Sequence, residues 1–139
     1  MLTIRRVLFP TDLSEGAQRA FPQAAFLADW HDAELHIVNV VPSDGEAEVP
    51  LPAPNDTLRG WLGASSPLAK AVEGLTIIQR QVESEMPPER LVAYAEDQDV
   101  DLVVMGTHGR RGVRRMLLGS VTEEVVRKAG CPVFTIQAE

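Results

Sequence analysis

The stretch of sequence that decides the fold covers residues 102–122, LVVMGTHGRRGVRRMLLGSVT. It opens with an apolar run, Leu102–Met105, which predicts a buried β-strand. At its far end, Ser120–Ala129 carries apolar residues at helical spacing and predicts an α-helix. The loop between the two contains the glycines Gly106, Gly109 and Gly119. A strand, a glycine-rich loop and a helix N-terminus in this order present backbone N–H groups to a phosphate.

Outward from this stretch, predicted strands and helices alternate. The predicted strands are Ile4–Phe9, Glu34–Val41, Leu75–Val82, Asp101–Met105 and Val133–Gln137. The predicted helices are Glu15–Trp30, Pro67–Glu73, Glu89–Gln98 and Ser120–Ala129. This alternation predicts an α/β fold with a doubly wound, five-stranded parallel sheet and helices on both faces. The first strand ends in Pro10-Thr11-Asp12 and the fourth in Gly106, and ligands bind where the winding of such sheets reverses. We therefore expect the strand order 3-2-1-4-5, with the reversal between strands 1 and 4.

Two stretches depart from regular patterns. Pro22 lies inside the first predicted helix, where we expect a kink and not a break because the apolar stripe keeps its phase. Residues 43–66 are rich in proline, glycine and small polar residues, which predicts a long loop or a mobile flap. Trp61 in this stretch is compatible with a lid, a partner contact or a plug on the core.

Length and composition set the class of protein. A chain of 139 residues predicts one domain over residues 1–139, large enough for a core without disulfides or metals. Its residues are 45% hydrophobic, and no apolar run approaches the roughly 18 residues of a membrane span. The N-terminus lacks the pattern of a secretory signal, so we expect a cytoplasmic protein. Cys131 is the only cysteine; we interpret it as a small buried residue and not as a reactive thiol.

The charge is unevenly distributed. A net charge of −7 argues against a general nucleic-acid-binding protein. Six of the 13 basic residues nevertheless fall close together, at Arg110, Arg111, Arg114, Arg115, Arg127 and Lys128. The last two suit the final turn of a helix. The four arginines of the loop have no such local reason, and they indicate an anionic partner.

Glycine and serine at the end of the loop have a mechanical use. Gly119 leaves the N–H groups of Ser120, Val121 and Thr122 open to a phosphate, and the helix dipole adds positive potential there. Ser120 and Glu123 also match a capping box, so a structural turn with an N-cap is the alternative. The two roles are compatible, because a cap satisfies only some of the free N–H groups.

One aspartate and the three histidines are the other polar residues with a candidate role. Asp12 is either a helix-start residue or an acceptor for a base or ribose. His108 either contacts a phosphate or braces the loop. His31 and His36 show no metal spacing, and we interpret them as surface or strand residues.

Several catalytic and nucleotide-binding motifs are missing from the sequence. It has no Gly-Lys-[Ser/Thr] loop and no Gly-x-Gly-x-x-Gly after the first strand. It also has no nucleophile elbow, no Cys–His pair and no cluster of carboxylates suited to acid–base work. We therefore expect a binding site and no catalytic residues.

Three segments resemble the universal stress protein family, and the resemblance covers nearly the whole chain. They are RVLFPTDLS at residues 6–14, DLVVMGTHGR at residues 101–110, and residues 119–133, which begin Gly-Ser-Val and end Cys-Pro-Val. The spacing Gly-x2-Gly-x9-Gly-Ser is the signature of the family's ATP-binding branch. The resemblance implies a homodimer, often paired through the last strand, and the same five-stranded α/β fold.

By position, the resemblance implies a nucleotide site in three parts. The adenine and ribose end would be met by Pro10, Thr11, Asp12 and Val40. The ribose and phosphate path would be lined by Met105, Gly106, His108, Gly109 and Arg110. The phosphates would be held by Gly119, Ser120, Val121 and Thr122. The cofactor would be ATP or another adenine nucleotide, with Mg or Mn coordinated mainly by phosphate oxygens and water.

The chain also departs from the family pattern. Residues 43–75 are poorer in helix than the family usually shows. Ser84-Glu85 stands where many members carry a glycine before the fourth helix.

Two functions of different class follow. The first is a dimeric signalling module of the stress response, which binds ATP with little or no turnover and changes its surface for a protein partner. The alternative is a slow ATPase or a self-phosphorylating protein, with Ser120 or Thr122 as acceptor. A third interpretation is a purely structural dimer that binds no nucleotide. No nucleic-acid or membrane partner is expected.

Overall fold

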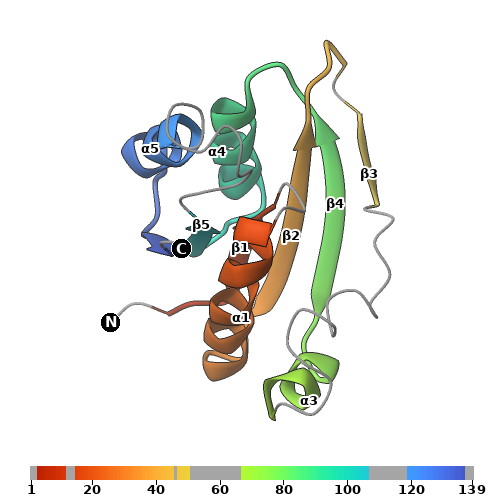
Figure 1. Ribbon diagram of the computed structural model, residues 1–139, viewed down its shortest axis with the longest axis vertical. Coiled ribbons are helices and arrows are strands. Elements are labelled where there is room, and N and C mark those ends of the chain that lie inside the picture. Colours follow the sequence, from red (N-terminus) through yellow and green to blue (C-terminus); the bar gives the residue numbers. More distant parts are fainter. Residues whose placement is uncertain (1–2, 12–14, 46, 51–66, 107–118, 137–139) are drawn as a thin grey trace.

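A parallel β-sheet forms the centre of the molecule (Figure 1). The computed structural model describes residues 3–11, 15–45, 47–50, 67–106 and 119–136. Within these residues six strands form one sheet, in the order β3-β4-β2-β1-β5-β6. The strands are β1 (Arg6–Pro10), β2 (Glu34–Val41), β3 (Glu48–Pro50), β4 (Ile77–Glu83), β5 (Leu102–Gly106) and β6 (Val133–Ile136). The five parallel strands confirm the predicted order 3-2-1-4-5.

β3 was not predicted. It runs antiparallel to β4 at the edge of the sheet, inside the stretch for which the sequence predicts only a loop or flap. Its position depends on contacts with distant residues. The N–H group of Glu83 donates to the carbonyl of Ala47 at 3.0 Å, and Glu48 forms ion pairs with Arg80 of β4 and Arg90 of the helix after it.

Within the described residues, four helices pack on the sheet: α1 (Glu15–Trp30), α3 (Pro67–Glu73), α4 (Pro87–Asp97) and α5 (Gly119–Lys128). α1 and α3 have the predicted bounds. α4 begins two residues earlier than predicted, because Pro87 and Pro88 occupy a first turn in which their missing N–H groups are not needed. α1 continues through Pro22 without a break, as predicted.

Both faces of the central strands β1, β2 and β5 are buried, and successive residues of these strands alternate between two cores. Val7 and Phe9 of β1 face α1 and α3, together with Val104 of β5. Leu8 and Val103 face α4 and α5 on the other side. In Figure 1, α1 overlies β1, and α4 and α5 lie together at the upper left. Burial on both faces explains why these strands are almost wholly apolar.

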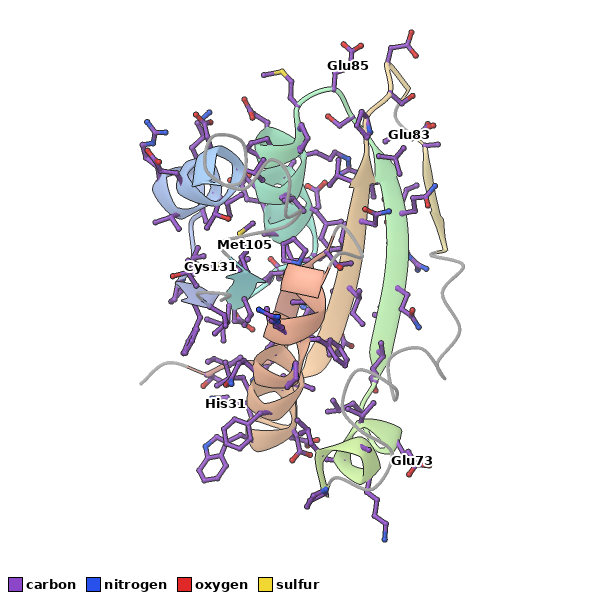
Figure 2. The ribbon with its side chains drawn as sticks, viewed as in Figure 1. His31, Glu73, Glu83, Glu85, Met105 and Cys131 are labelled. Carbon is purple, nitrogen blue, oxygen red and sulfur yellow. The ribbon has the colours of Figure 1, made fainter. Side chains whose placement is uncertain are left out.

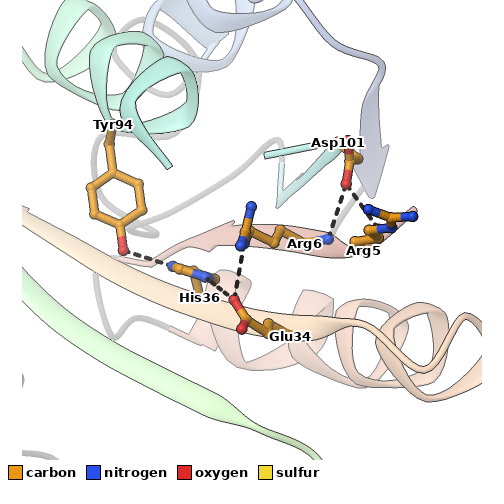
Figure 3. Close-up of polar contacts among 6 residues, drawn as sticks. All are labelled: Arg5, Arg6, Glu34, His36, Tyr94 and Asp101. Carbon is orange, nitrogen blue, oxygen red and sulfur yellow. Dashed lines mark hydrogen bonds and ion pairs between the residues drawn. The ribbon is translucent and has the colours of Figure 1, made fainter. Parts of the chain in front are cut away.

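A carboxylate at the amino ends of β1 and β5 connects the two strands (Figure 3). Asp101 Oδ2 accepts hydrogen bonds from the backbone N–H groups of Arg5 at 2.8 Å and Arg6 at 3.1 Å. The N–H group of Asp101 donates to the Arg6 carbonyl at 2.9 Å. These bonds hold the start of β1 against the start of β5, and Val7 pairs with Leu102 immediately after them.

The winding of the chain reverses between β1 and β5. From β1 the chain passes to β2 and β4 on one side of the sheet, and later to β5 and β6 on the other. The carboxyl ends of adjacent parallel strands at such a reversal are where open α/β sheets bind ligands. The ends of β1 and β5 therefore meet where the sequence predicts.

Candidate functional site

The carboxyl ends of three neighbouring strands bring together residues that are far apart in the sequence. Pro10 is the last residue of β1, and Gly106 is the last residue of β5. Val40 lies one residue before the end of β2. Thr11 follows β1, is buried, and donates its N–H group to the carbonyl of Val38 at 2.9 Å. Because β1 lies between β2 and β5, these residues share one edge of the sheet.

A hydrogen bond joins the first turn of α5 to the end of β5. Thr122 Oγ1 donates to the Gly106 carbonyl at 3.1 Å, across 16 residues of sequence. Thr122 is 8% exposed, so this bond is largely shielded from water. The N-terminus of α5 therefore lies beside the strand end at which the winding reverses.

The first turn of α5 is made of small or apolar residues. α5 as described includes Gly119, one residue before the predicted start of the helix, and Ser120 is its second residue. The first turn contains no acidic residue that would neutralise the helix dipole. Gly119, Ser120 and Val121 are the first three residues of α5 as described. The N–H groups at this end of an α-helix lack acceptors within the helix.

Apolar side chains lie at the same edge of the sheet. Met105 is buried in the core on the α4 and α5 side, and Val40 and Val121 are half-buried against that same core. Figure 2 shows Met105 on this side of the molecule and His31 at the distant end of α1. The structure thus brings apolar residues from β2, β5 and α5 into one core cluster.

Four of the predicted site residues lie outside the described residues: Asp12, His108, Gly109 and Arg110. The same holds for the other three loop arginines, Arg111, Arg114 and Arg115, and for Trp61. Their roles stay predictions.

The two basic residues at the end of α5 have carboxylate partners. Lys128 Nζ lies 2.9 Å from Glu124 on the same helix and 3.5 Å from Glu89 on α4. Arg127 also pairs with Glu124, at 3.3 Å. The hydrogen bond with Glu124 raises the pKa of Lys128. These contacts support the structural interpretation of Arg127 and Lys128 as residues of a last helical turn.

The sequence did not predict a chain of polar contacts beneath α4 (Figure 3). His36 lies in β2, as interpreted, but it is 1% exposed. Its Nδ1 lies 2.8 Å from the Tyr94 hydroxyl and its Nε2 lies 3.1 Å from a carboxylate oxygen of Glu34. Arg6 Nε donates to the same oxygen at 3.1 Å.

The electrostatics of this chain favour a charged carboxylate and a neutral phenol. The hydrogen bond from His36 and the hydrogen bond and charge of Arg6 hold the pKa of Glu34 below its usual value. Burial raises the pKa of Tyr94 to about 12. The only sequence signal was a histidine on a strand that is otherwise mostly apolar. Of its two partners, Glu34 lies on the same strand and Tyr94 comes from α4. Because both ring nitrogens are already engaged, we interpret His36 as a satisfied core residue.

The described residues offer no alternative metal centre and no membrane segment. They contain no group of three or more His, Cys, Asp or Glu side chains arranged to hold a metal ion. None of the helices described has the length and apolar character needed to cross a bilayer. Cys131 is half-buried beside the core, and burial raises the pKa of its thiol, which fits an inert packing residue.

A family model described as the universal stress protein family matches residues 3–137. The chain belongs to this family. Universal stress protein MJ0531 of Methanocaldococcus jannaschii is 34% identical over 145 residues, covering 96% of this chain and 82% of the relative. The match thus spans the strand ends and the first turn of α5.

Solved structures of universal stress proteins have the same fold. MJ0577 of M. jannaschii superposes with a TM-score of 0.70 at 25% identity, covering 99% of this chain and 98% of that chain. A universal stress protein solved in complex with cAMP superposes with a TM-score of 0.67 at 28% identity, covering 96% of this chain and 97% of that chain. At least one universal stress protein with this fold therefore binds an adenine nucleotide.

Proposed function

We propose that this universal stress protein binds an adenine nucleotide, with ATP as the expected ligand, at the carboxyl edge of β1, β2 and β5. The observation that carries the proposal is the hydrogen bond between Thr122 and Gly106, because it sets the first turn of α5 beside the end of β5. The complex of a relative with cAMP supports the ligand class.

Each part of the proposed site has a chemical task. The N–H groups of Gly119, Ser120 and Val121 donate to phosphate oxygens, and the helix dipole favours the negative charge. The half-buried side chain of Val40 offers an apolar surface for the base, and Met105 lies at the start of the ribose and phosphate path. The remaining predicted residues complete the site: Pro10, Thr11 and Asp12 at the adenine and ribose end, and Gly106, His108, Gly109 and Arg110 along the phosphate path.

Mg or Mn would accompany ATP and would be bound mainly by phosphate oxygens. Mg²⁺ in nucleotide sites keeps several water ligands and is coordinated by the phosphates more than by the protein. The described residues fit that arrangement, since they supply amides for the anion and no carboxylate cluster of their own at this edge.

We further propose that the protein is a homodimeric stress-response module and not an efficient enzyme. The Thr122 hydroxyl already donates to the Gly106 carbonyl, which disfavours it as a phosphate acceptor. β6 is an edge strand with Phe134 46% exposed, and exposed edges pair with other strands.

Calorimetry with ATP, ADP, AMP, cAMP and adenosine tests the proposal. We expect micromolar or tighter binding of at least one adenine nucleotide, with adenosine weaker than the nucleotides. Absence of binding by every compound would overturn the proposal. Incubation with labelled ATP and magnesium separates the two classes of function: rapid multiple turnover, near the roughly 10 per second typical of enzymes, would favour the ATPase.

A further inference from the structure

The geometry points to Thr122 as a positioning residue of the proposed nucleotide site, and this inference rests on the proposed function. We infer that its hydroxyl, bonded to the Gly106 carbonyl, fixes the direction in which the first amides of α5 point. Thr122 then acts on the phosphates through the helix, and its hydroxyl does not donate to them.

The place of Thr122 on the helix supports this role. Thr122 and Val125 are three residues apart, which puts them on one face of α5, and Ala129 directly follows the helix four residues after Val125. Val125 is 1% exposed and Ala129 packs against the core, so this face is buried. Valine has nearly the shape of threonine and would fill this position equally well. The contribution specific to threonine is therefore its hydroxyl.

The partner of that hydroxyl is a fixed point of the sheet. Gly106 pairs with Ile136 of β6, and β5 is held on its other side by β1. In many helices a threonine hydroxyl bonds a carbonyl of its own preceding turn. Here it bonds a carbonyl of another element, 3.1 Å away, and so ties the helix to the strand.

A hydrogen bond between Thr122 and Gly106 restricts rotation of α5 about its own axis. Apolar packing at Val125 and Ala129 holds α5 against the core but is not directional. Thr122 is the fourth residue of α5 as described, immediately after the three residues whose amides are proposed to bind the phosphates. Hydrogen bonds weaken steeply when donors are misaligned, so a small rotation of the first turn would weaken several N–H contacts to one phosphate together.

The test compares Thr122→Val, which removes the hydroxyl and keeps the shape, with Thr122→Ser, which keeps the hydroxyl. Calorimetry with ATP and with adenosine is the readout. We expect Thr122→Val to weaken ATP binding about tenfold, the scale of one lost hydrogen bond, and adenosine binding less than twofold. Thr122→Ser should stay within about threefold of the wild-type chain for both ligands.

Thr76→Val is the matched control. Thr76 is exposed at the amino edge of the sheet, before β4, so the same chemical change there should leave both affinities unaltered. Thermal unfolding of each variant verifies that it is folded at the temperature of the titration.

The possible outcomes distinguish failure of the positioning role of Thr122 from failure of the proposed nucleotide binding. ATP binding by Thr122→Val at wild-type strength would overturn the inference and leave the proposed function standing. Equal losses for ATP and adenosine would also overturn it, because Thr122 would then act through general stability. A wild-type chain that binds no adenine nucleotide would refute the proposed function and the inference with it.

Discussion

In the proposed site, Gly119 is the residue on which access of a phosphate to the α5 amides most depends. It is the first residue of the helix and carries no side chain that could cover the N–H groups of Ser120 and Val121. The same helix is followed by a second glycine, Gly130, around which an added Cβ would meet no atom within 4 Å. The two glycines thus offer a matched pair for substitution.

We predict that Gly119→Val weakens ATP binding by at least tenfold, because the branched side chain would stand where a phosphate approaches the amides. Gly130→Val, in open space at the far end of α5, should change the affinity less than twofold. Calorimetry on both variants checks the prediction. Unchanged binding by Gly119→Val would show that the phosphates lie elsewhere.

Glu34 is the residue whose contribution to folding stability is expected to depend most clearly on pH. Hydrogen bonds from His36 and Arg6 lower its pKa in the folded protein, so folding favours its charged form. Its contribution to stability is therefore present above its unfolded pKa of about 4.5, and is lost as the pH falls through the lower folded value.

We predict that Glu34→Gln makes the free energy of unfolding less dependent on pH below about 4.5, because glutamine does not titrate. Urea unfolding between pH 3 and 7 measures this dependence. Glu96→Gln removes an exposed carboxylate on α4 and serves as the control. A Glu34→Gln protein with the wild-type slope in acid would contradict the prediction.

At the scale of elements, the periodicity of apolar residues predicted most helices and strands. It did not predict β3, whose conformation depends on contacts with distant residues. α1, α3 and the five parallel strands follow from apolar spacing and from proline and glycine at their ends. β3 has three residues and includes Pro50, which is typical of a loop. It becomes a strand because β4 supplies hydrogen-bond partners and because Arg80 and Arg90 pair with Glu48.

The Asp101 carboxylate holds the start of β1 against the start of β5 through two hydrogen bonds. Removing this carboxylate tests its contribution to the packing of the two strands. Asp101→Ala removes the acceptor of two backbone N–H groups, so we predict a loss of about 1–3 kcal/mol in the free energy of unfolding. Asp101→Asn keeps one oxygen acceptor and should lose less. Urea unfolding at pH 7 compares the two variants, and equal stability of Asp101→Ala and wild type would refute this role.

At the scale of the whole molecule, the two edges of the described sheet differ. β3 is short and contains proline, features that discourage further pairing at that edge. β6 is a regular parallel strand on β5, with Phe134 and Thr135 exposed. This asymmetry favours β6 as the strand through which two copies of the chain would associate.

We predict that Phe134→Lys weakens the proposed dimer by at least tenfold, because two copies of a charged residue would meet at the paired edge. Sedimentation velocity over a range of protein concentrations gives the dissociation constant. Met86→Lys adds the same charge at a residue that is 56% exposed before α4, and should leave the association unchanged. A wild-type chain that stays monomeric at all concentrations would exclude the dimer.

The sequence by itself determined the element types, the parallel sheet, its strand order and the glycine-rich stretch before α5, because these depend on local spacing and on general rules of chain connection. Only the tertiary structure decided that β3 is a strand, that His36 is buried between Tyr94 and Glu34, and that Thr122 bonds the Gly106 carbonyl. Each of these depends on a partner more than 15 residues away, and no local pattern specifies which distant donor will meet which acceptor.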